Sequence, residues 1–222
     1  MRTIFITGGT GYVGKRLIRK LLQRGHRITA LVRQGSESRV PFGAETVIAD
    51  PFQPQTFQSN IPSGSVFIQL LGVPHPSPRK ARLFQEIDLR SVKASADAAA
   101  AAGVSHFIYV SVNMIPSKLM QAFQAVRSEG EDYCRSTGLY CTFLRPWYIL
   151  GPGHWWPILL LPLYGIAELV PSWRQKARAR ALVTIHQMIA ALIIAVEHNP
   201  QPLHIMEIRD IRNAVAALKK QG

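Results

Sequence analysis

Residues 3–22 read TIFITGGTGYVGKRLIRKLL, and this stretch decides the fold. It begins with a short apolar run, continues through a cluster of glycines, and ends with apolar residues at helical spacing. A strand that leads through a glycine-rich turn into a helix is typical of the first half of a β-α-β unit. The stretch therefore predicts a parallel sheet whose strands are connected by crossover helices.

The spacing of the glycines indicates a bound ligand. Gly9, Gly11 and Gly14 satisfy the pattern G-x-G-x-x-G, directly after a strand and at the start of a helix. One glycine of this pattern permits a tight turn, another lets the backbone approach a pyrophosphate, and the third lets helix and strand pack closely. The helix N-terminus adds partial positive charge. The pattern predicts a dinucleotide site.

Two other interpretations of these glycines exist. Gly9, Gly14 and Lys15 nearly complete the phosphate loop of nucleoside triphosphatases. Arg16 stands where that loop needs a hydroxyl group to ligate magnesium, so the sequence disfavours it. A bare strand-to-helix turn that holds no ligand is the second alternative.

The end of the next strand bears on the choice of cofactor. A dinucleotide site usually presents an acidic residue there, which binds the ribose diol of NAD. The strand predicted at residues 27–32 is followed instead by Arg33. A guanidinium suits a ribose 2′-phosphate, so we expect NADP (NADPH) rather than NAD, with help from Ser36, Ser38 or Arg39. A merely solvated Arg33 is the alternative.

The rest of the chain continues the alternation of strands and helices. Helices are expected at residues 12–24, ending at Gly25, and from about residue 78 to Gly103, where an alanine run would let the helix pack close to the sheet. Strand-like runs occupy residues 3–7, 27–32, 45–49, 65–71, 106–112, 140–145 and 202–208. We expect an α/β fold over residues 1–222: a single NAD(P)-binding, Rossmann-type doubly wound parallel sheet with a small C-terminal substrate or lid region.

Residues 146–181 differ in composition from the rest of the chain. Proline, tryptophan and leucine crowd together there, and we interpret the segment as an apolar lid or substrate insertion over the crevice. The apolar stretch at residues 155–173 is too short and too often broken by proline to cross a bilayer, which needs about twenty residues. The basic run that follows leaves a second interpretation open, in which this face makes peripheral contact with an anionic membrane.

Composition limits the classes of partner. The 222 residues are 47% hydrophobic and 18% charged, with a formal net charge of +13 that favours anions of every kind. No nucleic-acid-binding motif accompanies the charge, so we expect no specific nucleic-acid partner. Cys134, Cys141 and the seven histidines lack ligand spacing, so we expect no metal and assign the cysteines to packing. The absence of a signal-peptide pattern favours the cytoplasm.

The chain also resembles a known family. The residues that carry the resemblance are TGGTGYVG at 7–14, LVR at 31–33, AD at 49–50, YVSV at 109–112 and LRPWYILGPG at 144–153. Together they are similar to the atypical short-chain dehydrogenases/reductases, in particular the NmrA-like and NAD(P)H-binding subgroup. The resemblance implies that Asp50 faces the adenine, that Leu71 and Gly72 line the adenosine side, and that Ser111 takes the catalytic-serine position. The expected cofactor-binding residues are Thr7, Gly8, Gly9, Thr10, Gly11, Tyr12, Val13, Gly14, Arg33, Asp50, Leu71, Gly72, Ser111, Arg127 and Pro146.

One motif of the family is missing. Catalytic relatives carry Tyr-x-x-x-Lys on the helix after the serine strand, and alignment on the Gly–Glu pair at residues 130–131 puts Phe123 and Arg127 at those two positions. Phenylalanine has no proton to donate, whereas Arg127 could still bind the nicotinamide ribose or a phosphate. The remaining catalytic candidates are Ser111, Tyr148 and His75. Each also has an ordinary interpretation, in backbone hydrogen bonding or surface packing.

These features predict an NADPH-dependent reductase that acts on a small apolar, quinone-like acceptor. A reduced quinone is weakly basic and can take its protons from water, so the missing tyrosine is tolerable. The alternative is a non-catalytic NADP(H)-binding sensor, or a regulatory or assembly protein, which needs the cofactor site but no proton donor.

Overall fold

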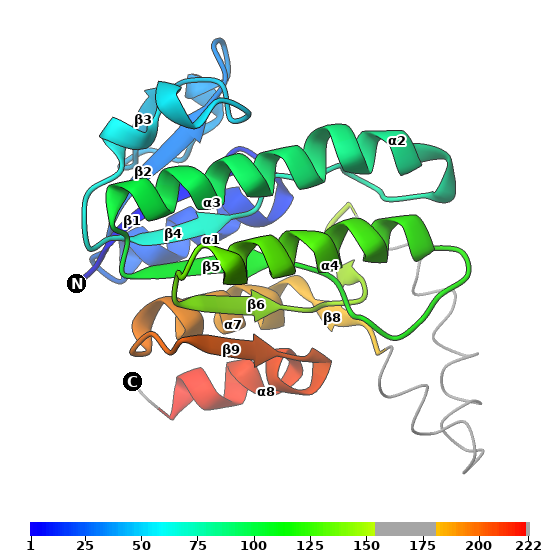
Figure 1. Ribbon diagram of the computed structural model, residues 1–222. Coiled ribbons are helices and arrows are strands. Elements are labelled where there is room, and N and C mark those ends of the chain that lie inside the picture. The colour runs from blue at the N-terminus through cyan, green and yellow to red at the C-terminus, as the bar shows by residue number, and fades with distance from the viewer. Residues whose placement is uncertain (154–180, 221–222) are drawn as a thin grey trace.

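The apolar runs of the sequence form one parallel sheet in the computed structural model, which describes residues 1–153 and 181–220. Helices cover both faces of this sheet (Figure 1). Its strands are β1 (Thr3–Thr7), β2 (Arg27–Val32), β3 (Glu45–Ile48), β4 (Val66–Gln69), β5 (His106–Val110), β6 (Cys141–Leu144) and β9 (Leu203–Met206). They lie in the order β3-β2-β1-β4-β5-β6-β9, and every neighbouring pair is parallel. The predicted Rossmann-type doubly wound sheet is confirmed.

The helices divide between the two faces. Helices α3 and α4 lie in front of the sheet in Figure 1, and α1 and α7 lie behind it, with α8 packed against α7. The helices are α1 (Tyr12–Gln23), α2 (Ala81–Leu83), α3 (Arg90–Ala102), α4 (Gln121–Ser136), α7 (Ile185–Glu197) and α8 (Ile208–Lys219). This arrangement buries both faces of the inner strands, which explains why their sequences are apolar almost throughout, whereas the edge strands β3 and β9 are largely exposed.

Alternation along each strand sends side chains into two separate cores. On β1, Ile4 and Ile6 pack with α1, α7 and α8, whereas Phe5 packs on the opposite side with α3 and α4. The second core contains a row of aromatic rings across neighbouring strands. The ring of Phe67 on β4 lies 5.4 Å from that of Phe5 and 5.2 Å from that of Phe107 on β5. The free thiols of Cys134 and Cys141 are buried in this core too.

The helix predicted from residue 78 to Gly103 is present but not regular. A 3-10 turn (Pro78–Lys80) and the short α2 lead into a π-helical segment, η5 (Phe84–Leu89), which continues directly into α3. The alanine run of α3 packs against the aromatic core, and the helix ends before Gly103, as predicted. The π-helical segment carries Asp88 into the interior, where the carboxylate is 1% exposed.

Two helices and a strand pair were absent from the sequence-based prediction. One helix is α7, in which ten of thirteen residues are buried, and the other is α8. A two-stranded pair formed by β7 (Ile149–Leu150) and β8 (Val183–Thr184) was not predicted either. This pair joins both ends of the proposed insertion at residues 146–181, whose residues 154–180 lie outside the described part of the chain. None of the helices in residues 1–153 and 181–220 is long and apolar enough to cross a membrane.

The aromatic row leads to a prediction about stability. Phe67→Ala removes a fully buried ring between two others, so it should lower the free energy of unfolding by about 3–5 kcal/mol. Phe42→Ala is the matched control, because Phe42 is 103% exposed and should cost less than about 0.5 kcal/mol. Urea titrations followed by circular dichroism compare the two variants, and equal midpoints would contradict the assignment of the core.

Candidate functional site

The site lies where the strand order reverses. Strand β1 is flanked by β2 on one side and by β4 on the other, so the connections from β1 and β4 leave the sheet in opposite directions. In open parallel sheets such a switch point creates a crevice at the carboxyl ends of the strands. The glycine turn after β1 and the segment after β4 meet at this crevice.

The glycine turn needs residues without side chains. Gly8 has a φ of 71°, and a Cβ atom on it would lie 2.7 Å from the carbonyl carbon of Leu70 and 2.8 Å from the amide nitrogen of Leu71. A Cβ atom on Gly14 would lie 2.8 Å from the Cα atom of Gly9, so this glycine permits the close packing of helix and turn. The positive φ belongs to Gly8, which precedes the three glycines of the sequence pattern. The turn is thus one residue earlier than the pattern implies.

Helix α1 begins immediately after this turn, at Tyr12. Its first turn carries no acidic residue, and its N-cap, Gly11, has no side chain that could compete for the free amides of the helix N-terminus. The amide of Gly11 donates to the carbonyl of Gly8 at 3.0 Å, which closes the turn. Such an arrangement fits the diphosphate of a dinucleotide, which binds where backbone amides and the helix dipole are unopposed.

A buried polar network fixes the start of the turn, and it was not predicted from the sequence. Gln69 at the end of β4 is fully buried and hydrogen-bonds to the Thr7 hydroxyl. It also bonds to the hydroxyls of Ser91 and Ser95 on α3, each at 3.1 Å. These bonds join β1, β4 and α3 below the crevice. The only signal in the sequence was a single glutamine at the end of an apolar strand.

The crevice opens into a cleft of about 300 Å³. Eleven of the residues that were predicted from sequence as site residues line it: Gly8, Gly11, Tyr12, Val13, Gly14, Gly72, His75, Ser111, Arg127, Pro146 and Tyr148. Residues from the beginning, middle and late part of the chain therefore meet in one place. Phe123, at the position of the missing tyrosine, lines the same cleft.

Ser111 is the candidate with the clearest capacity to bind a ligand. Its residue is 5% exposed, and its amide donates to the carbonyl of Leu144 at 2.8 Å. Its Oγ atom is buried and has no hydrogen-bond partner among the residues that the structure describes. A buried hydroxyl without a partner is costly, and a ligand with a carbonyl or amide group in the cleft would supply one. The residues present thus fit a nicotinamide group.

Arg127 is buried in the wall of the cleft, and its charge is balanced locally. One terminal nitrogen forms an ion pair with Asp88, and the other donates to the Tyr109 hydroxyl at 3.2 Å and to the Val110 carbonyl at 2.9 Å. Burial lowers the pKa of Arg127, but Tyr109 and Asp88 more than offset this, so the net shift is upward. Arg127 therefore stays protonated and can contribute positive charge but no proton.

Phe123 and Tyr109 complete this wall. Phe123 lies one helical turn before Arg127 on α4, and its ring centre is 4.9 Å from the guanidinium carbon. Burial raises the pKa of Tyr109 to about 12, so its phenol is a poor acid near neutral pH. Neither side chain replaces the tyrosine of the missing motif as a proton donor.

The other two catalytic candidates also reach the cleft. His75 lies on the exposed loop after β4, with a φ of 50°, and its carbonyl accepts a hydrogen bond from Lys80 Nζ at 3.0 Å. Tyr148 lines the same cleft from the segment just before β7, and its hydroxyl is buried. Ser111, His75 and Tyr148 are therefore brought to one cleft, as the sequence analysis proposed.

The other predicted site residues lie along the same edge of the sheet but are not among the described residues that line the cleft. They are Thr7, Gly9, Thr10, Arg33, Asp50 and Leu71. Arg33 follows β2 directly and is exposed. Asp50 follows β3, and its carboxylate accepts from the Phe52 amide at 2.9 Å and from the Gln53 side chain at 2.8 Å. These bonds stabilise its own turn. In residues 1–153 and 181–220, no group of three or more His, Cys, Asp or Glu could hold a metal ion.

The fold and the glycine turn define a dinucleotide-binding protein, and comparison with known proteins identifies its family. The model of the NAD(P)H-binding family matches residues 8–152. The chain belongs to this family.

Two curated relatives illustrate the range of the family. Ceramide reductase from Caulobacter vibrioides is 30% identical over 213 residues, which are 94% of this chain and 65% of that protein. Photosystem II assembly factor Ycf39 from Guillardia theta is 26% identical over 144 residues, which are 64% of this chain and 45% of that protein. The chain thus spans less than two thirds of the length of either relative.

Among solved structures, a UDP-galactose 4-epimerase superposes with a TM-score of 0.69 at 17% identity, over 97% of this chain and 82% of that one. At this level of identity the likeness extends to the fold alone.

The close approach at Gly8 leads to a prediction about binding. Gly8→Ala should push the turn away from Leu70 and displace the helix N-terminus, so the affinity for a nicotinamide cofactor should fall at least about tenfold. Gly64→Ala is the matched control, because Gly64 has the same φ of 71° but a Cβ atom there meets nothing within 4 Å. The control should lose about 1 kcal/mol of stability and no affinity. Calorimetric titration with NADPH and NADH distinguishes them, and equal affinities of the two variants would refute the prediction.

Proposed function

We propose that this chain binds NADPH in the cleft and uses it to reduce a small apolar, quinone-like acceptor. The observation that carries the proposal is the buried Ser111 hydroxyl, which has no partner among the described residues and lies in the same cleft as Phe123 and Arg127. The cleft therefore offers a hydrogen bond and a fixed positive charge, but no acid at the position of the family's tyrosine.

Each part of the cofactor has residues to hold it. The turn from Thr7 to Gly14 would bind the diphosphate through Gly8, Gly9, Thr10, Gly11, Tyr12 and Val13, and Pro146 would border the nicotinamide side. Asp50, Leu71 and Gly72 would face the adenosine. Arg33, exposed at the end of β2, would bind the ribose 2′-phosphate and so favour NADP over NAD. Arg127 would place its charge beside the nicotinamide ribose.

The chemistry requires little of the protein beyond positioning. When bound, NADPH supplies a hydride, and becomes NADP⁺ as two electrons pass to the acceptor. Ser111 would donate a hydrogen bond to the acceptor oxygen on which negative charge develops, and the Arg127 guanidinium would stabilise that charge. The hydroquinone anion that results is a weak base and takes its proton from water, so no side chain needs to donate one. His75 and Tyr148 would border the acceptor.

The acceptor would be enclosed by the late part of the chain. We place all 222 residues in one domain, with residues 146–181 as its substrate insertion. In support, Trp147, Tyr148 and Ile149 line the cleft, and β7 pairs with β8, so that both ends of this insertion are held beside the crevice. The similarity to a protein named ceramide reductase supports reduction as the activity, without defining the acceptor.

A second candidate function is a non-catalytic NADP(H)-binding protein with a regulatory or assembly role. Phe123 favours it, because a binding protein has no need of a proton donor. The similarity to Ycf39, which is named as a photosystem II assembly factor, also favours it. The two functions make the same use of the glycine turn and differ only in whether bound NADPH is consumed.

Turnover distinguishes the two functions. With NADPH and a panel of quinones, the loss of cofactor absorbance should exceed the uncatalysed rate, and Ser111→Ala should lower kcat/KM about tenfold because it removes a hydrogen bond to developing charge. Ser65→Ala is the matched control, since Ser65 Oγ is also buried without a partner among the described residues but lies at the opposite edge of the sheet. Tight NADPH binding without turnover of any quinone would favour the binding protein.

The preference for NADPH can be tested separately. Arg33→Ala should weaken NADPH binding about tenfold and leave NADH binding unchanged, because only NADPH carries the 2′-phosphate. Arg27→Ala at the other end of β2 removes a similarly exposed charge far from the crevice and should change neither affinity. If the parent chain binds NADH as tightly as NADPH, the assignment of NADP is wrong.

A further inference from the structure

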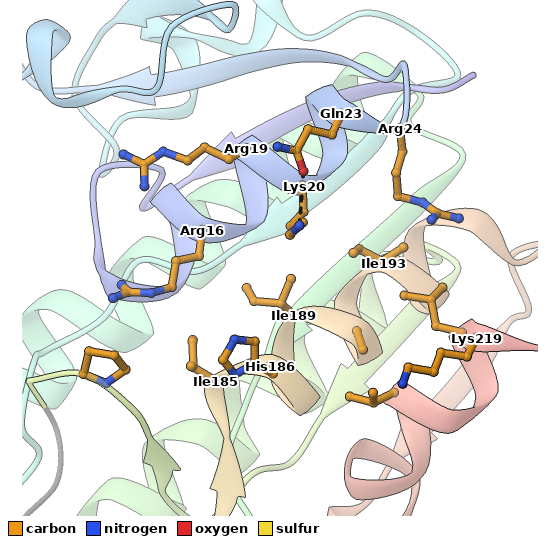
Figure 2. A pocket seen from close by; sticks show the side chains of 14 residues that line it. Arg16, Arg19, Lys20, Gln23, Arg24, Ile185, His186, Ile189, Ile193 and Lys219 are labelled. Atoms are coloured by element: carbon orange, nitrogen blue, oxygen red, sulfur yellow. Dashed lines mark hydrogen bonds between the residues drawn. The ribbon is translucent and has the colours of Figure 1, made fainter. Parts of the chain in front are cut away.

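A second hollow lies on the outer side of the molecule, away from the cleft. It has a volume of about 690 Å³ and is bounded by α1, α7 and α8 (Figure 2). We call it the α1–α7–α8 groove. Its described lining residues come from these three helices, from Arg24 directly after α1 and from Pro152. The groove and the cleft share no lining residue, so they are separate sites.

The floor of the groove is apolar. Ile185, Ile189 and Ile193 recur every four residues along α7 and form a stripe about 12 Å long on one face of the helix, where each residue is only 3–7% exposed at the floor of the groove. Val215 and Leu218 of α8 continue this surface on one side. Figure 2 shows the isoleucines between α1 and α8, at the bottom of the hollow. Such a surface fits a hydrocarbon chain.

The rim of the groove is cationic. Arg16, Arg19, Lys20 and Arg24 project from α1, and Lys219 extends from the end of α8. No aspartate or glutamate is among the described lining residues. Of these cations, Arg24 is paired with Glu197 at 2.6 Å, and Arg16 donates to the Tyr12 carbonyl at 2.9 Å.

Two of the rim cations are available to a ligand. Neither Arg19 nor Lys219 has a hydrogen bond or ion pair within the described part of the chain, and both are exposed. They come from two different helices that border the groove, Arg19 from α1 and Lys219 from the end of α8. An anionic group at the mouth of the groove would therefore meet positive charge from both walls.

We propose that the α1–α7–α8 groove binds a single-chain anionic amphiphile. Its hydrocarbon chain would lie along the isoleucine stripe, and its carboxylate or phosphate head would be held by the cations of the rim. A volume of about 690 Å³ is within the range of small-molecule sites. The proposal does not depend on the reductase activity, because the groove shares no residue with the cleft.

Charge and shape disfavour two other occupants. A second copy of the chain docked symmetrically through this groove would bring two rows of like charge together, which is repulsive. Nucleic acid would pair its phosphates with the rim but would leave the apolar floor unused. An anionic amphiphile would contact the apolar floor with its hydrocarbon chain and the cationic rim with its head group.

A series of fatty acids tests the groove directly. Octanoate, decanoate and dodecanoate, titrated as monomers at low salt in a calorimeter, should bind the parent protein with affinities that rise about fourfold for each added methylene. Decanol has the chain without the charge, and acetate and inorganic phosphate have the charge without the chain, so each should bind at least about tenfold more weakly than decanoate. Equal affinity for decanol and decanoate, or for acetate and decanoate, would overturn the proposal.

Two pairs of variants locate the binding site. Arg19→Glu/Lys20→Glu should weaken decanoate binding about tenfold, whereas Arg27→Glu/Arg209→Glu makes the same change in net charge at exposed positions outside the groove and should not. Leu218→Gln should reduce the gain per methylene, and Leu203→Gln on β9 should not.

The same variants provide a check on folding and on alternative occupants. NADPH affinity should be unchanged in the charge variants, because neither pair lies in the cleft, and the melting temperature should not fall, because the two Glu substitutions on α1 replace like-charged pairs with opposite-charged ones. If the groove variants bind decanoate as the parent does, or if the parent binds anionic vesicles but no monomeric fatty acid, the proposal is wrong. Dimerisation of the parent that Arg19→Glu/Lys20→Glu abolishes would assign the groove to a second copy instead.

Discussion

The close approach of two backbone segments at the carboxyl edge of the sheet is the constraint on which the rest of the site depends. Gly8, after β1, lies so near the Leu70–Leu71 peptide, after β4, that no side-chain carbon fits between them. Because the turn is this tight, β1 and β4 stay paired in register as far as Thr7 and Gln69. The turn also lets α1 begin at the switch point. A displaced turn would move the amides of the helix and open the Gln69 network below them.

A second constraint is the buried charge of Arg127. Burying a guanidinium is costly unless its donors are paired, and here Asp88, the Tyr109 hydroxyl and the Val110 carbonyl are partners for the two terminal nitrogens, whereas Nε has no partner among the described residues. Asp88 also accepts from the Val73 amide at 3.0 Å, so the same carboxylate fixes the loop after β4. A lysine has its three donors on a single nitrogen, whereas these partners are reached from the two separate terminal nitrogens of the planar guanidinium. The Arg127 network therefore holds the wall of the cleft together where the family's usual motif is missing, and neither Arg127 nor Tyr109 in it donates a proton near neutral pH.

The sequence predicted the sheet and much of the cleft because these depend on local signals. A few neighbouring residues are enough to recognise the glycine turn, the alternating apolar runs and the position of Ser111 directly after β5. Gln69 and Asp88 were missed because their roles depend on partners far away in sequence, Ser95 for the first and Arg127 for the second. The π-helical segment that carries Asp88 inward has no clear sequence signal either. Helix α7 was missed because it is apolar on nearly all sides, which obscures the helical period.

The charge pattern of α1 connects both sites to the basic composition of the chain. Lys15 and Arg19, and Arg16 and Lys20, are like-charged pairs four residues apart, and no acidic residue on α1 compensates them. Such pairs destabilise a helix by about 0.2–0.5 kcal/mol each. The helix forms because its opposite face buries leucine and isoleucine against the sheet, which offsets this cost many times over. The like-charged pairs on α1 lower the stability of the helix. Proteins commonly retain such destabilising residues at positions that bind a ligand. Helix α1 presents positive charge in two places. Its N-terminus faces the cleft, and the basic side chains on its outer side border the α1–α7–α8 groove.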